Sequence, residues 1–211
     1  TMTMHTSSDY RPSMLIPGRA LAEQVFSRAA GAPLLGGNDI SLLIDAEENY
    51  PAWMECLESA DRSIHFEMFF IREDATGREF ADILMRKARQ GVRVRVLYDW
   101  LGCLFKTSNA FWQGMRRAGV EVRCFNFPRM DSPMGWLSRD HRKVIIVDSQ
   151  IAFVTGLCVG QMWRGYPERS IEPWRDTGVR IRGPAVADIE KAFSEVWAIT
   201  GSPLATEDLS L

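Results

Sequence analysis

The chain has 211 residues, 46% hydrophobic and 25% charged, with 25 basic against 27 acidic side chains and a formal net charge of −2. This composition is typical of a globular protein with one sizeable domain, and it excludes a disordered chain, a collagen and a disulfide miniprotein. Charged residues interrupt the apolar runs well before the roughly 20 residues that a bilayer span needs. The near-neutral charge does not favour nucleic acid as a partner, because phosphate neutralisation normally requires a basic excess.

The hydrophobic periodicity first predicts a flexible polar tail over 1–20 and then a regular alternation of elements. In chain order we expect a helix at 20–31, a strand at 38–45, a helix at 49–61, a strand at 63–71, a helix at 76–91, a strand at 92–100, a helix at 108–119 and a strand at 120–126. Strands that alternate with helices at this spacing indicate right-handed crossovers and a largely parallel sheet.

Beyond residue 126 the alternation breaks. We expect a loop at 127–139, strands at 141–148 and 151–156 joined antiparallel by a turn at Ser149–Gln150, an irregular stretch at 161–174, a strand at 176–183, a helix at 184–200 and a mobile tail at 201–211. No linker divides the chain. We therefore predict one α/β domain over 21–200, with a mixed, largely parallel sheet and helices on both faces.

The cysteine and histidine pattern predicts no metal site. The four cysteines form no C-x-x-C pair, and the three histidines are scattered. The first residues have neither the basic start nor the apolar core of a secretory signal. We expect reduced thiols and a cytoplasmic location, at most peripheral on the inner membrane.

The motif His141-x-Lys143-x-x-x-x-Asp148 lies on one predicted strand. Alternation places His141 and Lys143 on the same face, about 7 Å apart, where an imidazole and an ammonium group together favour an anion. Asp148 falls on the opposite face, and we expect it to bind the backbone of the following turn. Asp176 begins a later strand and is a candidate partner for a ring nitrogen of His141.

Around this motif the chain resembles the phospholipase D superfamily, and more narrowly the N-terminal, first-motif half of bacterial cardiolipin synthase-type enzymes. The stretches that carry the resemblance are 63–102, 139–156 and 173–197. The resemblance implies a phospholipase D-like fold with one repeat of the usual two. It also implies phosphodiester transfer through a phosphohistidine, without metal or cofactor.

Each motif position carries an implied role. His141 matches the nucleophile, Lys143 the phosphate-binding lysine, Asp148 the motif aspartate and Asp176 the acid that hydrogen-bonds the histidine. Glu67 matches an acidic residue common in the cardiolipin synthase-like group, and a satisfied structural pair is an equally open interpretation.

Two features depart from the family pattern. Thr155-Gly156-Leu157-Cys158 stands where the family has Gly-Ser-x-Asn or Gly-Gly-x-Asn, so Cys158 replaces an asparagine that helps to hold phosphate. Gly156 and Cys158 remain candidates for substrate binding, although packing is the favoured role of Cys158. The motif also occurs only once. We therefore expect the second motif to come from a homodimer partner or from the missing half of a longer protein, and we expect the chain alone to be nearly inactive.

Apolar residues outside the strands suggest a lipid partner. Trp136, a further candidate for substrate binding, lies in the predicted loop with four other large apolar residues, and a second group surrounds the predicted helix at 108–119. Core packing is the alternative for that second group. We expect a phospholipid substrate and a membrane surface as partners. Two other functions stay open: a dimeric, metal-independent phosphodiesterase or nuclease, and a non-catalytic module that binds anionic lipid.

Overall fold

The computed structural model describes residues 17–30, 34–128 and 138–209. The chain divides into two compact units, 1–36 and 37–211. The first contains the helix α1 (Pro17–Ala30), which begins three residues before the start of the predicted helix. Most of the predicted tail at 1–20 lies outside the described residues.

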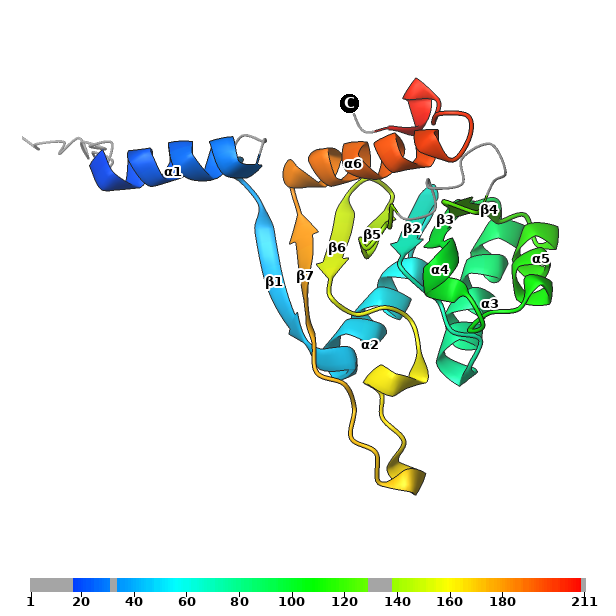
Figure 1. The fold of residues 1–211 in the computed structure, drawn as a ribbon. Coiled ribbons are helices and arrows are strands. Elements are labelled where there is room, and N and C mark those ends of the chain that lie inside the picture. Colours follow the sequence, from blue (N-terminus) through cyan, green and yellow to red (C-terminus); the bar gives the residue numbers. More distant parts are fainter. Residues whose placement is uncertain (1–16, 31–33, 129–137, 210–211) are drawn as a thin grey trace, which may run out of the picture. The chain divides into compact units, whose positions relative to one another are not determined.

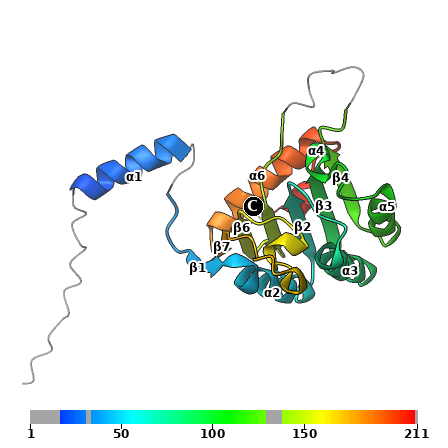
Figure 2. The same ribbon diagram turned by 60° about the horizontal axis from the view of Figure 1, so that its bottom comes forward.

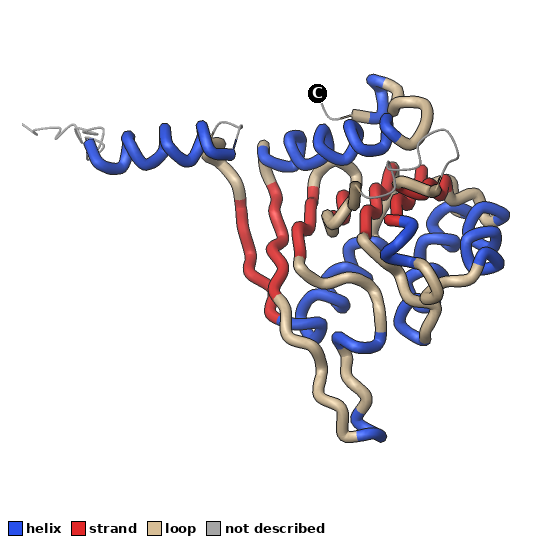
Figure 3. Tube along the Cα trace, viewed as in Figure 1, coloured by secondary structure: helices blue, strands red, loops and turns tan. Residues whose placement is uncertain are grey.

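The second unit is built on a seven-stranded sheet with the order β1-β7-β6-β5-β2-β3-β4 (Figures 1 and 3). Its strands are β1 (Asp39–Ile44), β2 (Ser63–Met68), β3 (Arg93–Asp99), β4 (Glu121–Phe125), β5 (Val144–Val147), β6 (Ile151–Thr155) and β7 (Thr177–Arg182). These bounds agree with the predicted strands to within three residues at either end.

The prediction of a largely parallel sheet is wrong in this detail. Only β2, β3 and β4 pair in parallel, whereas β2–β5, β5–β6, β6–β7 and β7–β1 are antiparallel. A parallel pair needs a long crossover, and only two such connections, each containing a helix, join neighbouring strands. The β5–β6 connection is instead a tight turn. It centres on Asp148 and Ser149, one residue earlier than predicted, and both have the positive φ of a two-residue hairpin turn.

Helices cover both faces of the sheet, as predicted (Figure 2). On one face α2 (Asp45–Glu58), α3 (Ala75–Arg89) and α5 (Asn109–Arg117) enclose a core around Trp53, Phe66 and Phe80. On the other face α6 (Ala185–Ile199) packs Phe193 and Trp197 against the sheet. The first face is the one from which Lys143, Ile145 and Val147 project, because alternate residues of a strand share a face.

Shorter helices complete the unit: α4 (Trp100–Cys103), η2 (Gln161–Trp163), η3 (Pro167–Arg169) and η4 (Thr206–Asp208). In the last of these Asp208 forms an ion pair of 2.6 Å with the buried Arg95 and a second one with Arg93. The predicted mobility of 201–211, like the predicted domain extent of 21–200, stays a prediction.

The strand directions bring the segments that carry His141, Lys143, Gly156 and Asp176 to one edge of the sheet. Strands β1, β2, β3 and β6 end there, and β5 and β7 begin there, because Glu67 pairs with Val144 and Thr155 pairs with Gly178. Segments that are more than 100 residues apart in the sequence therefore meet at this edge. We call it the motif edge.

Candidate active site

His141 and Lys143 precede β5, and their side chains meet at the motif edge. Lys143 Nζ lies 3.1 Å from His141 Nδ1 and donates a hydrogen bond of 2.6 Å to the backbone oxygen of His141. The imidazole is exposed, whereas Lys143 is only 6% exposed. Phe69 packs against both groups: its ring centroid lies 4.7 Å from the imidazole centroid and 5.6 Å from Lys143 Nζ. The imidazole and the ammonium group thus share one corner.

The contact between the two side chains determines which ring nitrogen carries the proton. An ammonium group only donates, so Lys143 uses the lone pair of His141 Nδ1, and a neutral ring then carries its proton on Nε2. For Nε2 to act as a nucleophile, the proton must move to Nδ1 and Lys143 must turn away. The geometry is therefore that of a resting site.

Burial governs the charge of Lys143. It lowers the pKa of the ammonium group below the ordinary lysine value, while nearby Cys158, Asp176 and Asp140 act in the opposite direction. Within the described residues the ammonium group donates to no carboxylate. A buried cation without an anionic partner is costly, so this corner favours an incoming anion.

Asp176 lies beside the backbone of Gly156. A Cβ atom on Gly156 would come within 2.0 Å of Asp176 Oδ1, so this position requires glycine for the carboxylate to sit where it does. The same oxygen accepts a 2.8 Å hydrogen bond from the N–H of Thr177, and Asp45 Oδ1 accepts one of 2.9 Å from the N–H of Asp176. Among the described contacts there is none between Asp176 and His141. Their pairing stays a proposal.

Cys158 is buried next to this corner. It is 1% exposed, its thiol lies against the backbone of Phe69 and Phe70, and its carbonyl oxygen accepts a 2.8 Å hydrogen bond from the Tyr50 hydroxyl. Burial raises the pKa of the thiol to about 11. A neutral, covered thiol is a poor nucleophile, so the geometry favours a packing role over a reactive one.

Asp148 lies at the other end of β5, seven residues after His141, which corresponds to about 23 Å at roughly 3.3 Å per residue. Its carboxylate accepts three backbone hydrogen bonds, from the N–H groups of Asp61, Arg62 and Ser63, at 2.7–2.9 Å. The expected backbone role is present, but the partner is the segment that leads into β2 rather than the following turn. Asp148 therefore anchors the hairpin to the neighbouring strand.

Glu67 belongs to a buried ionic network behind the motif. Its Oε1 accepts hydrogen bonds of 3.1 and 2.9 Å from Arg142, which also lies 3.7 Å from Asp140. Oε2 of Glu67 and Oδ2 of Asp140 are buried without a hydrogen-bond donor. Burial, and then the negative charge of Asp140, raise the pKa of Glu67 to about 8, although Arg142 opposes them. Glu67 does not face the shared corner, and it supports the residues on either side of His141.

Asp99 is a part of this region that the sequence analysis missed. It caps α4 through the N–H of Gly102 and accepts bonds of 2.9 Å from Arg139 and 3.0 Å from the N–H of Asp140. Asp99 is fully buried and fixes the backbone just before His141. Its signal was an aspartate at the end of an apolar strand, three residues before a glycine.

Trp136, the remaining candidate, lies outside the described residues, as does most of its loop. In the described part of the chain no three metal-ligating side chains lie close enough together to hold an ion. None of the helices described is both long and apolar enough to cross a membrane.

Residues 53–197 match the model of the cardiolipin synthase, phospholipase D-like domain. This is more than half of the chain, so the protein belongs to that phospholipase D-type family. Among curated proteins it is 38% identical over 178 residues to a cardiolipin synthase of Geobacillus kaustophilus and 34% identical over 171 residues to cardiolipin synthase A of Pseudomonas fluorescens. The matches cover 83% and 78% of this chain but only 35% and 34% of those proteins.

Solved structures agree on the fold. Nuc, a phospholipase D family member from Salmonella typhimurium, aligns with a TM-score of 0.58 at 16% identity, over 81% of this chain and all of that one. The phosphatidylserine synthase of Haemophilus influenzae aligns with a TM-score of 0.57 at 19% identity, over 79% of this chain and 37% of that one. The chain thus has a phospholipase D-like fold and spans about a third of the length of the curated relatives.

Proposed function

We propose that this chain carries one half of the active site of an enzyme that transfers or hydrolyses phosphodiesters of phospholipids at the cytoplasmic face of the inner membrane. The cardiolipin synthases to which it is similar support this substrate class. The single observation that carries the proposal is the shared corner, where a buried lysine without a carboxylate partner meets an exposed histidine.

The chemistry is a double displacement at phosphorus. Phosphate draws the Lys143 ammonium group away from the imidazole, and Lys143 then stabilises the negative charge that builds up on the phosphoryl oxygens. The lone pair of His141 Nε2 forms a bond to phosphorus while the bond to the leaving alcohol oxygen breaks. Before the attack the ring proton moves from Nε2 to Nδ1, and Asp176, once its carboxylate has turned from the Thr177 N–H, accepts a hydrogen bond from this Nδ1–H. An acceptor alcohol, or water, then attacks phosphorus and loses its proton to the second histidine described below, and the bond between phosphorus and the imidazole breaks.

The leaving alcohol needs a proton, which the described part of this chain does not place at the corner. We propose that a second histidine, from a homodimer partner or another segment carrying the same motif, supplies it as a general acid. The motif occurs once in these 211 residues. Without this general acid, the chain by itself should cleave only phosphodiesters whose leaving group is stable as an anion and needs no proton.

That consequence gives a direct experiment. A phosphodiester of p-nitrophenol needs no acid catalyst, so the chain alone should release at most one equivalent of nitrophenolate in a burst and retain an acid-labile phosphoryl group. The leaving group of phosphatidylglycerol is an alcohol, which must be protonated as it departs. This substrate should therefore not be turned over until the second motif is supplied. Both reactions should persist with chelator present.

Two variants make the experiment decisive. His141→Asn should abolish both the nitrophenolate burst and the acid-labile phosphoryl group on the protein. His5→Asn, the same substitution at another histidine, should leave both intact. A burst that survives His141→Asn would exclude the proposed nucleophile. Failure of the unaltered chain to react, combined with binding to anionic vesicles, would instead favour a non-catalytic lipid-binding module, and turnover of DNA alone would favour a nuclease.

A further inference from the structure

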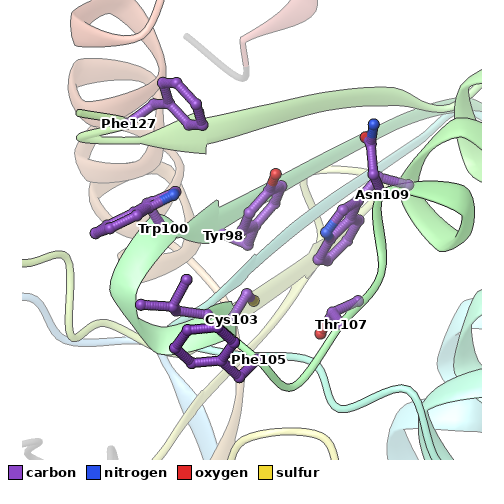
Figure 4. Close-up of a pocket in the computed structure, with 9 residues that line it drawn as sticks. Tyr98, Trp100, Cys103, Phe105, Thr107, Asn109 and Phe127 are labelled. Atoms are coloured by element: carbon purple, nitrogen blue, oxygen red, sulfur yellow. The ribbon is translucent and has the colours of Figure 1, made fainter. Parts of the chain in front are cut away.

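A pocket of about 380 Å³ opens at the end of β3 (Figure 4). Tyr98 lies near its centre, with Trp100 and Phe127 on one side and Thr107 and Asn109 on the other. Leu104, Phe105, Cys103 and Trp112 complete the lining. Its volume lies in the range of roughly 300–1,000 Å³ that small-molecule sites occupy.

The pocket has an apolar rim that the described chain leaves in water. Phe105 is 98% exposed and Phe127 is 61% exposed. Phe105 also has a φ of +59°, a conformation that is costly for a bulky side chain. No contact within the described chain compensates the free-energy cost of this exposed ring and its unfavourable backbone conformation, which points to a bound apolar group.

The walls are fixed before any ligand arrives. The rings of Tyr98 and Trp112 stack with centroids 3.9 Å apart, and Trp100 packs edge-on to Phe127 at 6.3 Å. The hydroxyl of Thr107 is already committed to the backbone oxygen of Ile71. Seven of the nine lining residues are hydrophobic and five of these are aromatic, which favours a hydrocarbon chain over a sugar.

The pocket lies on the same face and the same edge as the shared corner. Tyr98 pairs with Met68 of β2, and β2 in turn pairs with β5. Strands are about 4.8 Å apart, so β3 and β5 are separated by about 10 Å. Between them stands Phe69, which contacts His141 and also lies under α4, where a Cβ atom on Gly102 would come within 2.0 Å of its oxygen. Phe69 thus contacts the shared corner on one side and, on the other, the helix α4 that contributes Trp100 and Cys103 to the pocket.

We propose that this pocket holds an acyl chain of a glycerophospholipid whose phosphate lies at Lys143. The inference deepens the proposed function and rests on it for the position of the phosphate. The separation of about 10 Å leaves room for the glycerol backbone between the two sites. Lys106, whose ammonium group donates to the oxygen of Gly102 and lies 4.7 Å from the Phe70 ring centroid, stands near this path.

The test is photocrosslinking of the full chain with phosphatidylglycerol that carries a diazirine in the middle of one acyl chain, followed by peptide mapping. We expect adducts within 98–112 and competition by long-chain but not by short-chain phosphatidylglycerol. Asn109→Trp, which fills the pocket from its exposed rim, and Phe105→Ser should each lower the yield at least fivefold. Phe26→Ser, the same change in α1, should not.

The outcomes separate this inference from the proposed function. Adducts in the pocket that persist in His141→Asn support the acyl site even if the nitrophenolate burst fails. Adducts that map neither within 98–112 nor at Phe127, or a yield independent of chain length, overturn the acyl site whether or not the burst occurs. If Asn109→Trp and Phe105→Ser both leave the yield unchanged while circular dichroism shows intact folding, another surface binds the chain.

Discussion

One sequence motif spans β5, and its two ends differ in solvent exposure and in how their charged groups are paired. At the motif edge His141 is exposed, and the buried ammonium group of Lys143 donates no hydrogen bond to a carboxylate of the described chain. At the other end the carboxylate of Asp148 accepts three hydrogen bonds from backbone N–H groups. One motif can therefore join a reactive end to a structural end through a strand that fixes both.

Substituting each end of β5 separately tests whether the reactive and the structural roles are independent. Lys143→Met should lower turnover by at least about 10²-fold, because it removes the charge that stabilises the transferred phosphoryl group. Stability should not fall, since the variant relieves a buried charge. Activity in the presence of the second motif and urea unfolding measure the two effects. Retained turnover would contradict the assigned role.

Asp148→Ala should show the reverse pattern. Three backbone N–H groups lose a charged acceptor, so the free energy of unfolding should fall by about 2 kcal/mol. Asp148→Asn, which keeps an acceptor oxygen and tolerates the positive φ, should lose less. Urea denaturation provides the values, and the rate per folded molecule should stay within about threefold. A large rate loss in a stable Asp148→Asn protein would place this residue in the chemistry.

Gly156→Ala tests how closely the motif edge is packed. Its Cβ atom would displace the Asp176 carboxylate, so we expect a loss of about 1–3 kcal/mol in stability together with reduced turnover. Gly114→Ala is the matched control. The nearest atom to its Cβ is the flexible end of Arg117 at 4.0 Å, and alanine favours a helix over glycine. Gly114→Ala should be neutral or stabilising, and equal losses in both variants would remove the close contact as the cause.

These residues also show how far the sequence leads. Strand alternation is local, so it correctly placed helices and strands and put His141 and Lys143 together. The position of β1 beside β7, and the N–H groups at 61–63 that bind Asp148, depend on contacts between distant segments. No periodicity encodes those contacts. The network of Glu67, Arg142 and Asp140 is likewise visible only once β2 and β5 are known to be neighbours.

The pH dependence of stability should distinguish this network from the solvent-exposed acids. The folded state raises the pKa of Glu67 to about 8 from 4.5, so between these values the folded chain binds the proton more tightly than the unfolded chain. Stability from this group is therefore complete below about pH 4.5 and falls as the pH rises towards 8, by up to about 1.4 kcal/mol per pH unit.

Glu67→Gln should flatten that slope, because an amide does not titrate. Glu47→Gln, at an exposed position of α2, should leave the slope unchanged. Urea unfolding at three pH values between 5 and 8 measures the slope in each protein. If the unaltered chain shows no decline over this interval, Glu67 is ionised in the fold and the two unsatisfied carboxylate oxygens need another donor.

The smallest expected effect concerns Cys158, the residue that departs from the family pattern. Its thiol is buried and has a pKa raised to about 11, so near neutral pH almost none of it is thiolate. Iodoacetamide at pH 7.5 should label it at least about 10²-fold more slowly than a free thiol of ordinary pKa, and labelling should accelerate on unfolding. Cys158→Ala should cost about 1 kcal/mol and change turnover less than about threefold. Rapid labelling that also stops turnover would identify the Cys158 sulfur, rather than the His141 imidazole, as the reactive group.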